Sequence, residues 1–359
     1  MRIAFYISSL SGGGAERVLC TLANQLSREN NEVHVVSLEK RKQFYQLDKE
    51  VKLHRINNTS KNRIKETIND ICFIKKCVKN IKADVSVSFL MRCNLLLLLA
   101  NLFNKQKVIV CDRNNPLKEH SEKVFKISNL IYARANLIVV QTNQIKTFYD
   151  KKLQYKITVQ ENPIDSVALH NQLEGKDMLK ENTVISIGRL EQQKDFVTLI
   201  KAYSKVCKDY TDWKLKIFGV GEMQEQLNKL IIDLGCEDKI LLCGHTHTPF
   251  YELSKSKVFV LSTKYEGFPN VLCEAMEAGL PCIASDCVSG PRELIQNNEN
   301  GWLFEIANVD ELETLLRMCM SNDMSEVGAK AKKSVERLHL DSNLKSWKDM
   351  FEKVLQNEK

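Results

Sequence analysis

Short runs of β-branched and apolar residues alternate along the whole chain with longer stretches in which apolar positions recur at helical spacing. Such runs predict buried strands, and the stretches between them predict amphipathic helices that cover a sheet. In the first half we expect strands at residues 2–7, 32–37, 51–56, 85–89, 107–111, 137–140 and 157–159. Helices are expected between them, at 15–27, 63–81, 93–103, 118–133 and 143–151.

A second series of the same kind predicts strands at 184–187, 214–218, 240–242, 258–261, 282–284 and 301–304. Regular alternation of strands and helices indicates parallel sheets built from βαβ units. We therefore predict an α/β chain with two Rossmann-like, doubly wound parallel-sheet domains. Ligands of such domains bind at the carboxyl ends of the strands, so we expect the site in a central cleft that both domains face.

The domain boundaries follow from the same pattern. Residues 166–181 contain turn residues and charges but little periodicity, which is typical of a linker between a domain at 1–165 and a domain at 182–340. The last stretch, 341–359, contains an amphipathic helix that could pack on either domain. Its apolar positions are Leu344, Trp347, Met350, Phe351 and Leu355.

Composition excludes several classes of protein. The longest apolar run, which begins at Leu95, is far shorter than the roughly 20 residues that a bilayer-spanning helix needs. The apolar run at the N-terminus lacks the length and the cleavage site of a signal peptide, so we expect a cytosolic protein. The 12 cysteines are scattered without a Cys-x-x-Cys pair, and we interpret them as reduced residues that fill the cores.

Basic residues concentrate between positions 61 and 82, where seven lysines and arginines face two acids. Apolar residues recur through this segment at helical spacing, namely Ile64, Ile68, Ile71, Phe73, Ile74 and Val78. A basic amphipathic helix can lie on an anionic membrane surface. The alternative is a helix that packs on a domain core and presents a solvated basic face. The net charge of +7 is modest, and we expect no nucleic-acid partner.

Two carboxylates, Glu266 and Glu274, bracket a stretch whose first half forms a turn and whose second half begins a helix that runs to about Ala278. Free backbone amides at a helix N-terminus attract anions, because the first N–H groups lack partners and the helix dipole is positive there. An acid on each side of such a site predicts a ligand with both phosphate and hydroxyl groups. The alternative is a pair of solvated residues at the helix end.

Glycine-rich turns follow two of the predicted strands. Gly12, Gly13 and Gly14 open the first helix and permit the backbone to approach an anion or a sugar closely, although a plain tight turn is the alternative. Gly219 and Gly221 suit a turn that lets a nucleobase or a ribose approach. An ordinary strand-to-helix turn explains them equally well.

Protein cations are expected to bind the phosphates. Arg189 and Lys194 follow the first strand of the second half, where a forked guanidinium and a point charge suit a diphosphate, with ordinary surface charge as the alternative. His245 and His247 lack a third ligand at metal spacing, and no Asp-x-Asp pair is present to hold a divalent ion. We therefore expect no metal and no cofactor, and a leaving diphosphate would rely on cations and backbone amides.

With these residues the chain resembles glycosyltransferase family 4, the retaining enzymes of the GT-B fold. It is most similar to the bacterial branch that extends lipid-linked glycans. The resemblance covers essentially the whole length and rests on the order and spacing of several motifs. These are residues 12–18, Asn162-Pro163, Gly188-Arg189-Leu190 with Lys194, residues 266–274 and Ser289-Gly290-Pro291-Arg292-Glu293.

The resemblance implies a nucleotide-sugar donor bound mainly by the second domain. Arg189 and Lys194 would hold the diphosphate, Glu266 the donor sugar and Glu274 the ribose hydroxyls, and we take Glu266, Arg189 and Lys194 as the catalytic residues. The implied donor-binding positions also include Gly13, Gly14, Gly219, Gly221, Gly267, Phe268, Pro269, Asn270 and Val271. The resemblance further implies that the helix at 341–359 crosses back to the first domain.

One region departs from the family pattern. Many members carry a histidine beside the donor sugar, at the end of a strand of the first domain, whereas this chain has Cys111-Asp112-Arg113. We expect Asp112 or Arg113 to contact the sugar or the acceptor in its place. The selectivity for the sugar depends most on this substitution.

These inferences predict a glycosyltransferase, retaining and metal-independent, on the inner face of the cell membrane. It would move a hexose or N-acetylhexosamine from a UDP-sugar to a polyprenyl-diphosphate-linked saccharide in surface-polysaccharide assembly. One alternative is another GT-B enzyme, such as an epimerase or a phosphorylase, and a second is a non-catalytic paralogue that binds nucleotide or lipid. The second should have lost at least one of the four charged site residues, and all four are present.

Overall fold

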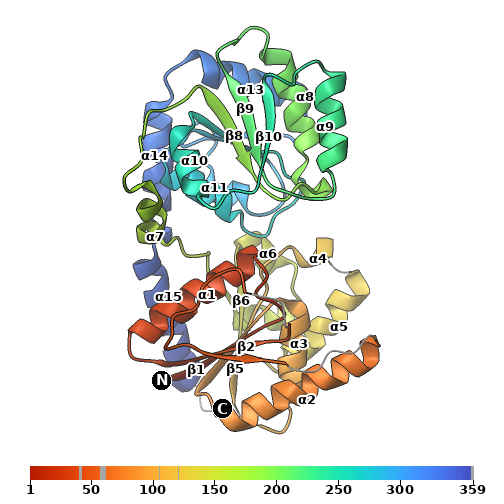
Figure 1. The fold of residues 1–359 in the computed structure, drawn as a ribbon. Helices are drawn as coiled ribbons and strands as arrows, with labels where there is room; N and C mark the ends of the chain where they lie inside the picture. The colour runs from red at the N-terminus through yellow and green to blue at the C-terminus, as the bar shows by residue number, and fades with distance from the viewer. Residues whose placement is uncertain (40–42, 57–61, 105, 120, 357–359) are drawn as a thin grey trace. The chain divides into compact units, whose positions relative to one another are not determined.

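The computed structural model describes residues 1–39, 43–56, 62–104, 106–119 and 121–356. The chain forms two compact units (Figure 1), the first of Met1–Pro163 with Asp341–Lys359 and the second of Ile164–Leu340. It therefore crosses between the units twice, after Pro163 and after Leu340. The stretch expected as a linker, 166–181, belongs to the second unit and includes α7 (Ser166–His170) and the 3-10 turn η2 (Asn171–Leu173).

The first unit is built on a seven-stranded parallel sheet with the strand order β3-β2-β1-β4-β5-β6-β7. All seven strands lie where the apolar runs predict them. They are β1 (Arg2–Ile7), β2 (Glu32–Ser37), β3 (Lys52–Arg55), β4 (Val85–Phe89), β5 (Lys107–Cys111), β6 (Leu137–Val140) and β7 (Ile157–Val159).

Helices cover both faces of this sheet, because successive strand residues point to opposite sides and are apolar on both. On one face, α1 (Gly14–Arg28) and α15 (Leu340–Gln356) pack side by side, and they are drawn in red and blue in Figure 1. The other face carries α2 (Arg63–Ile81), α3 (Met91–Ala100) and α5 (Glu122–Tyr132). The unit also contains α4 (Pro116–Glu119), α6 (Asn143–Thr147) and the 3-10 turn η1 (Lys151–Lys156).

The last helix of the chain completes the core of the first unit. Trp347 and Phe351 of α15 are fully buried in the same apolar cluster as Leu19 and Leu22 of α1. The side-chain amide of Asn343 donates to the carbonyl of Glu161 at 2.8 Å and fixes the start of the helix. Residues 357–359 of the expected terminal segment lie outside the described residues.

Two expected helices are wrong in their extent. The stretch 118–133 is two helices, because the Ser121 hydroxyl accepts a hydrogen bond from the backbone amide of Val124 and caps a new helix there. The helix expected at 143–151 ends at Thr147 and is followed by the 3-10 turn η1. Local capping and turn formation override the continuous apolar periodicity in both places.

The second unit is built on a six-stranded parallel sheet in the order β10-β9-β8-β11-β12-β13. Its strands are β8 (Thr183–Ile187), β9 (Lys214–Phe218), β10 (Ile240–Gly244), β11 (Val258–Leu261), β12 (Cys282–Ser285) and β13 (Trp302–Phe304). One face packs against α8 (Phe196–Val206), α9 (Gln224–Asp233) and α13 (Val309–Ser321). The other packs against α10 (Pro249–Lys255), α11 (Asn270–Glu277) and α14 (Ser325–Val335).

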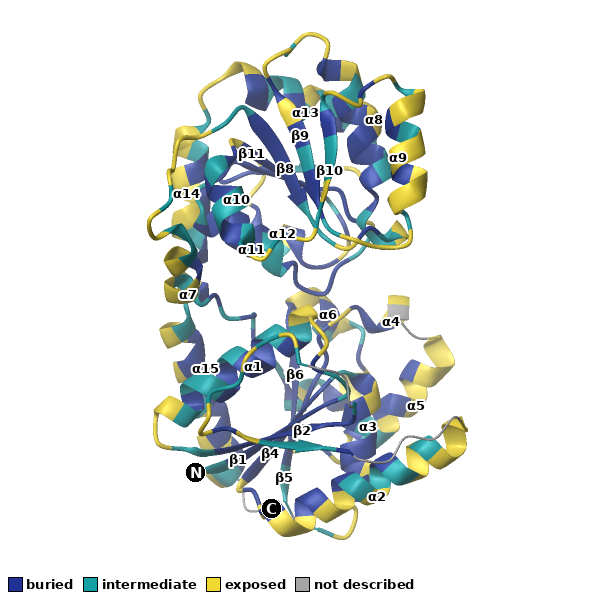
Figure 2. Ribbon diagram, viewed as in Figure 1, coloured by how far each residue is buried: buried dark blue, intermediate teal, exposed yellow. Residues whose placement is uncertain are grey.

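Burial follows this layering. In Figure 2 the strands are mainly dark blue, whereas the outward faces of helices such as α9 and α14 are yellow. Three short elements complete the second unit: η3 (Gln192–Lys194), α12 (Pro291–Leu294) and η4 (Glu336–Leu338).

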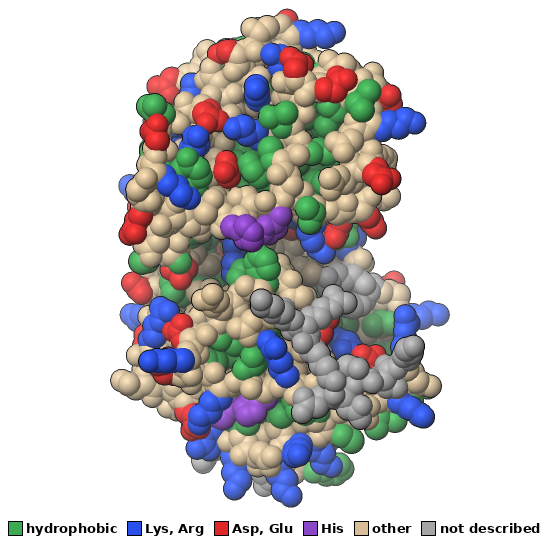
Figure 3. All heavy atoms as spheres, in the orientation of Figure 1, with side chains coloured by type: hydrophobic (Ala, Val, Ile, Leu, Met, Phe, Trp, Pro, Cys, Tyr) green, Lys and Arg blue, Asp and Glu red, His purple; other side chains and the backbone are tan. Residues whose placement is uncertain are grey.

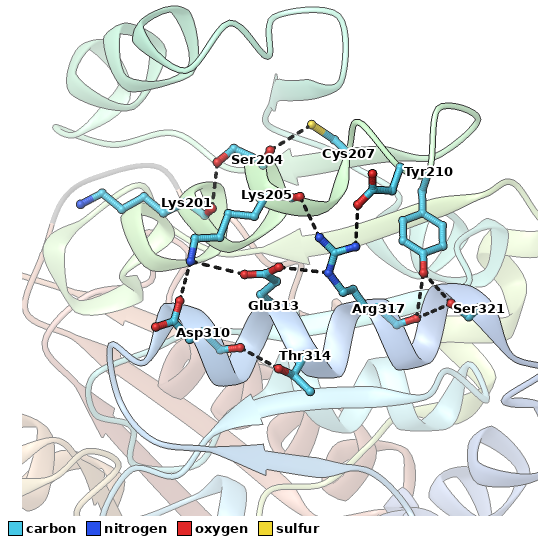
Figure 4. A network of polar contacts seen from close by, with 11 residues as sticks. Lys201, Ser204, Lys205, Cys207, Tyr210, Asp310, Glu313, Thr314, Arg317 and Ser321 are labelled. Atoms are coloured by element: carbon cyan, nitrogen blue, oxygen red, sulfur yellow. Dashed lines mark hydrogen bonds and ion pairs between the residues drawn. The ribbon is translucent and has the colours of Figure 1, made fainter.

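An ion-pair network joins α13 to α8 at the surface (Figure 4). Lys205 of α8 lies 2.5 Å from Asp310 and 3.3 Å from Glu313, and Arg317 joins Glu313 to Asp209. Ion pairs between exposed side chains are screened by water and contribute little to stability. The apolar contacts that α8 and α13 share beneath the network therefore contribute more to holding the two helices together.

Both sheets reverse their strand order beside the first strand of the unit. In the second unit β8 lies between β9 and β11, so the connections that leave β8 and β11 turn to opposite sides. Such a switch point leaves a crevice at the carboxyl ends of the two strands, where ligands of doubly wound sheets bind. The loops that follow these strands carry Lys194 and Glu266.

Candidate active site

An ion pair between Lys194 and Glu266 forms the centre of the candidate site. Lys194 Nζ lies 2.5 Å from Glu266 Oε1, and the two side chains are only 16% and 9% exposed. The backbones are joined as well, because the amide of Lys264 donates to the carbonyl of Gln193 and the Ser262 hydroxyl donates to the carbonyl of Lys194. The second unit alone therefore brings together two residues that are far apart in the sequence.

This pair suits a ligand with a phosphate beside a hydroxyl. A phosphate at Lys194 and a sugar hydroxyl at Glu266 would each replace part of the existing ion pair. A mostly buried pair carries a desolvation penalty that its mutual attraction offsets only partly. A ligand that contacts both groups can therefore bind without leaving either charge unpaired.

Backbone amides lie next to the pair. Pro269 caps the N-terminus of α11, and its carbonyl accepts hydrogen bonds from the amides of Leu272 and Cys273. Within the described part of the chain, the amides of Gly267, Phe268 and Val271 have no hydrogen-bond partner. Unpaired amides at the positive end of a helix attract an anion.

Glu274 follows on the same helix and is 5% exposed, and Glu266 is 7% exposed. Neither is therefore a solvated residue at a helix end, which was the alternative interpretation of the two glutamates. Burying a carboxylate is costly unless it is hydrogen-bonded, so both positions favour a polar ligand or a polar network.

The motif that begins at Ser289 packs against the loop between Glu266 and Pro269. The Ser289 hydroxyl donates to the carbonyl of Glu266. Gly290 has φ +96°, and a Cβ there would lie 2.7 Å from Cδ of Pro269. Burial, and then the carboxylate of Glu266, raise the pKa of the neighbouring Cys287 thiol to about 12, so Cys287 is not a nucleophile at neutral pH.

Arg189 stands apart from the buried pair. Its side chain is 70% exposed and forms a salt bridge of 2.9 Å with Glu191. The structure thus places Lys194 and Glu266 together but leaves Arg189 at the surface of the loop. Its role at a diphosphate stays a prediction.

Gly219 and Gly221 have a packing role in the structure. A Cβ on Gly219, whose φ is +152°, would lie 1.9 Å from the carbonyl oxygen of Gly188, and one on Gly221 would lie 2.4 Å from that of Leu190. These glycines let the turn after β9 contact the loop that carries Lys194. Whether they also contact a donor stays a prediction.

The glycine loop of the first unit contains a carboxylate that sequence reasoning missed. Gly13 is the N-cap of α1, and a Cβ there would lie 2.3 Å from Oε2 of Glu16. The Ser9 hydroxyl donates to Oε1 of Glu16 at 2.9 Å. A carboxylate in this position repels phosphate and accepts hydrogen bonds from hydroxyls, which weighs against a direct contact of the Gly13 and Gly14 loop with a diphosphate. Whether the loop contacts a donor stays a prediction. An acid in the first turn after three glycines is the signal that could have identified Glu16.

Asp112 and Arg113 both point into the first unit. Asp112 accepts hydrogen bonds from Tyr132, Tyr149 and Asn94, all of which are buried. Arg113 donates to Asn162 Oδ1 at 2.8 Å, its guanidinium lies over the Phe89 and Trp347 rings, and burial lowers its pKa. Both residues thus have structural partners, and a contact with sugar or acceptor stays a prediction.

Comparison with known proteins identifies the family of the chain. The chain matches the family Glycosyltransferase Family 4 over residues 12–167 and the family Glycosyl transferases group 1 over residues 173–337. An uncharacterized glycosyltransferase of Methanocaldococcus jannaschii is 31% identical over 70% of this chain and 68% of its own length.

Two further proteins are similar over nearly the whole chain. The N-acetylgalactosamine-N,N'-diacetylbacillosaminyl-diphospho-undecaprenol 4-alpha-N-acetylgalactosaminyltransferase of Campylobacter jejuni is 28% identical over 90% of this chain and 91% of its own length. The crystal structure of Anabaena HepE in complex with UDP and glucose superposes with a TM-score of 0.83, at 16% identity, over 98% of this chain and 99% of that one.

Two Rossmann-like parallel-sheet units with a site of this kind define a glycosyltransferase of the GT-B fold. The matched regions together cover most of both units and include the motifs described above. The chain belongs to glycosyltransferase family 4, with the group 1 domain as its second half.

Proposed function

We propose that this glycosyltransferase is retaining and metal-independent, and that it moves a hexose or N-acetylhexosamine from a UDP-sugar to a polyprenyl-diphosphate-linked saccharide. The observation that carries the proposal is the Lys194–Glu266 pair beside the N-terminus of α11. It offers a cation for phosphate and a carboxylate for hydroxyls at one point. Campylobacter relatives whose names specify undecaprenol-linked substrates, and a UDP complex of a protein with this fold, support the choice of donor and acceptor.

Each residue has a role in the proposed reaction. Lys194, Arg189 and the free amides after Glu266 stabilise the diphosphate, Glu266 orients the donor sugar, and Glu274 accepts from the ribose. As the bond from C1 to the β-phosphate oxygen breaks, the acceptor oxygen bonds to C1 from the same face. The acceptor proton passes to the leaving phosphate, which explains why no protein base is required. Fixed cations and amides then replace a metal as the stabilising charge.

UDP should raise the melting temperature of the protein in the presence of EDTA, because a ligand that binds only the folded state stabilises it. The Glu274→Gln variant should bind UDP roughly 10- to 100-fold more weakly, the cost of losing charge-assisted hydrogen bonds. Thermal shift with UDP, GDP and ADP measures this. Glu225→Gln, an exposed acid at the start of α9, is the matched control.

Several results would contradict the proposal. No shift with UDP near millimolar concentration would reject the donor, and a shift that requires Mg²⁺ would reject metal independence. An unchanged UDP affinity in Glu274→Gln would remove Glu274 from the site. Product analysis with a UDP-sugar separates transfer from epimerisation, since only transfer consumes an acceptor.

We also propose that the first unit docks on an anionic membrane, where a lipid-linked acceptor resides. The helices α2, α3 and α5 share one face of the sheet, and large apolar side chains point outward from them or from the turn after α3: Ile64, Ile68, Leu99, Leu102, Phe103, Val124, Ile127 and Leu130. Phe103 is 89% exposed, and Lys75 lies over its ring at 5.9 Å. No helix in the described ranges is long and apolar enough to cross a bilayer.

The α2 helix packs on the core along its second half and is exposed at its start. Ile74, Val78 and Ile81 are buried in the core, whereas Ile64 and Ile68 are exposed at the start of the helix. Figure 3 shows blue side chains along the lower edge of the first unit, where α2 runs. Exposed apolar groups among lysines match a surface of anionic headgroups over acyl chains. Lys61 lies outside the described residues.

The protein should float with vesicles that contain an anionic lipid and stay unbound with purely zwitterionic vesicles. The Ile64→Glu/Ile68→Glu variant should lose most of this binding, because it removes apolar area and adds negative charge. Ile232→Glu, at an equally exposed isoleucine of α9 in the second unit, is the control. Undiminished flotation of the double variant would reject this surface.

A further inference from the structure

Glu277, the last residue of α11, accepts hydrogen bonds from two histidines. His170 Nε2 lies 3.2 Å from Glu277 Oε1, and His339 Nε2 lies 2.9 Å from Glu277 Oε2. The carboxylate is almost completely buried, with 1% of the residue exposed. We call this arrangement of Glu277, His170 and His339 the clasp.

A buried carboxylate is unfavourable at this position. The C-terminus of a helix carries the negative end of its dipole, so an acid there is repelled, and removal from water adds a further cost. Both oxygens of Glu277 are compensated by an imidazole N–H. An apolar residue at this position would avoid the cost of burying a charge. Glu277 instead joins α11 to the segments that carry His170 and His339.

The two histidines lie next to the points where the chain crosses between the units. We call residues 164–170 and 336–340 the crossing segments. His170 ends α7, which begins two residues after Ile164, and His339 precedes Leu340, the last residue of the second unit. The amide of Ile164 donates to the carbonyl of Leu338 at 2.8 Å, and the amide of Leu340 donates to that of Ile164 at 2.9 Å. The two crossing segments are thus paired with each other and joined to α11.

The opposite end of α11 carries the candidate donor site. Its N-terminus follows the loop with the free amides, and Glu274 lies one turn before Glu277. Leu272 and Met276 of α11 share an apolar cluster with Ile164 and Leu338 from the crossing segments. A helix of this length spans only about 12 Å, so a displacement at one end is transmitted to the other.

We infer that Glu277 is a positioning residue for the donor site. Through His170 and His339 it fixes α11 to both crossing segments, and the order of the 267–270 loop, together with its affinity for the donor, depends on this connection. A displacement of the crossing segments would therefore alter the order of the 267–270 loop. The inference rests on the proposed function only for the identity of the ligand, UDP.

Hydrogen–deuterium exchange of the full chain tests the clasp with and without UDP. In Glu277→Ala we expect faster exchange in three peptides together, covering 164–170, 267–277 and 336–340, and UDP affinity about tenfold lower, as for the loss of hydrogen bonds to a charged group. Glu277→Gln preserves the packing if the alanine variant fails to fold. Glu237→Gln, an exposed acid of the same unit, is the control.

A conservative variant separates positioning from plain stability. His339→Ala removes the N–H from which Glu277 accepts a hydrogen bond and should lower UDP affinity. His339→Gln retains an N–H near the position of Nε2, so its UDP affinity should stay close to that of the wild type. Adding His339→Ala to Glu277→Ala should weaken UDP binding no further, because coupled residues are non-additive. Independent, additive losses would overturn the inference.

The outcomes distinguish the clasp from the proposed function. If the wild type binds UDP and Glu277→Ala leaves both loop exchange and UDP affinity unchanged, the clasp is rejected and the donor assignment stands. If the variant changes loop exchange alone, the link to donor affinity is rejected. If the wild type binds no UDP, the donor assignment fails, and exchange of the 267–270 loop in the free protein still decides whether Glu277 orders it.

Discussion

Replacing Lys194 with alanine is expected to lower turnover by a factor of about 10²–10³, the usual cost of removing one group that stabilises developing charge. Lys194 is the partly buried cation of the candidate site, and its partner Glu266 cannot stabilise a leaving diphosphate. Because the charge on the diphosphate grows as the sugar departs, kcat should fall more than the donor KM changes. Steady-state kinetics with a UDP-sugar measure this, and near wild-type turnover would reject the assignment.

The variant also leaves Glu266 buried without its partner, which typically costs about 3–5 kcal/mol of stability. Lys194→Met combined with Glu266→Gln removes both charges at similar volume and should recover much of that stability without recovering activity. Lys201→Ala, at an exposed lysine of α8 (Figure 4), is the control and should leave both properties unchanged. Recovery of activity in the double variant would show that Lys194 acts on stability alone.

Gly219→Ala should be among the most destabilising single substitutions in the second unit. The new Cβ would lie 1.9 Å from the carbonyl oxygen of Gly188, at φ +152°, and neither backbone can move without displacing the loop that carries Lys194. Overpacking and the strained φ together should cost roughly 3–5 kcal/mol. Thermal unfolding followed by circular dichroism would measure the loss, and UDP affinity should fall with it.

Gly235→Ala is the matched control for this prediction. Gly235 also has a positive φ, +63°, but a Cβ there would meet no atom within 4 Å. It should therefore lose only the roughly 1–2 kcal/mol of the left-handed conformation. Equal melting temperatures for the two variants would show that the contact between Gly219 and Gly188 relaxes easily.

Much of the architecture could be predicted from local pattern, because each strand of a covered parallel sheet is a short apolar run whatever its neighbours are. The helix from Asn270 could be predicted as well, since proline and glycine end the preceding turn. The break at Ser121 was missed because a serine inside an apolar periodicity is equally compatible with a solvated helix position.

The contacts of individual polar residues were less predictable. The hydrogen bonds of Asp112 with Tyr132 and Tyr149 could not be predicted, because only the packing of later segments brings these two tyrosines to its carboxylate. Glu277, His170 and His339 are similarly remote in sequence and form no motif. The Lys194–Glu266 pair is a favourable case, because parallel strands place their following loops at one edge of the sheet.

The return of α15 to the first unit also constrains how the protein is made. The second unit is one continuous segment, whereas the first lacks Trp347 and Phe351 until the whole second unit has been synthesised. At roughly 5–20 residues per second, the ribosome needs on the order of ten to forty seconds to add the segment between Pro163 and Asp341. During that time the apolar surface of α1 that packs with α15 stays uncovered, so the second unit can fold before the core of the first is complete.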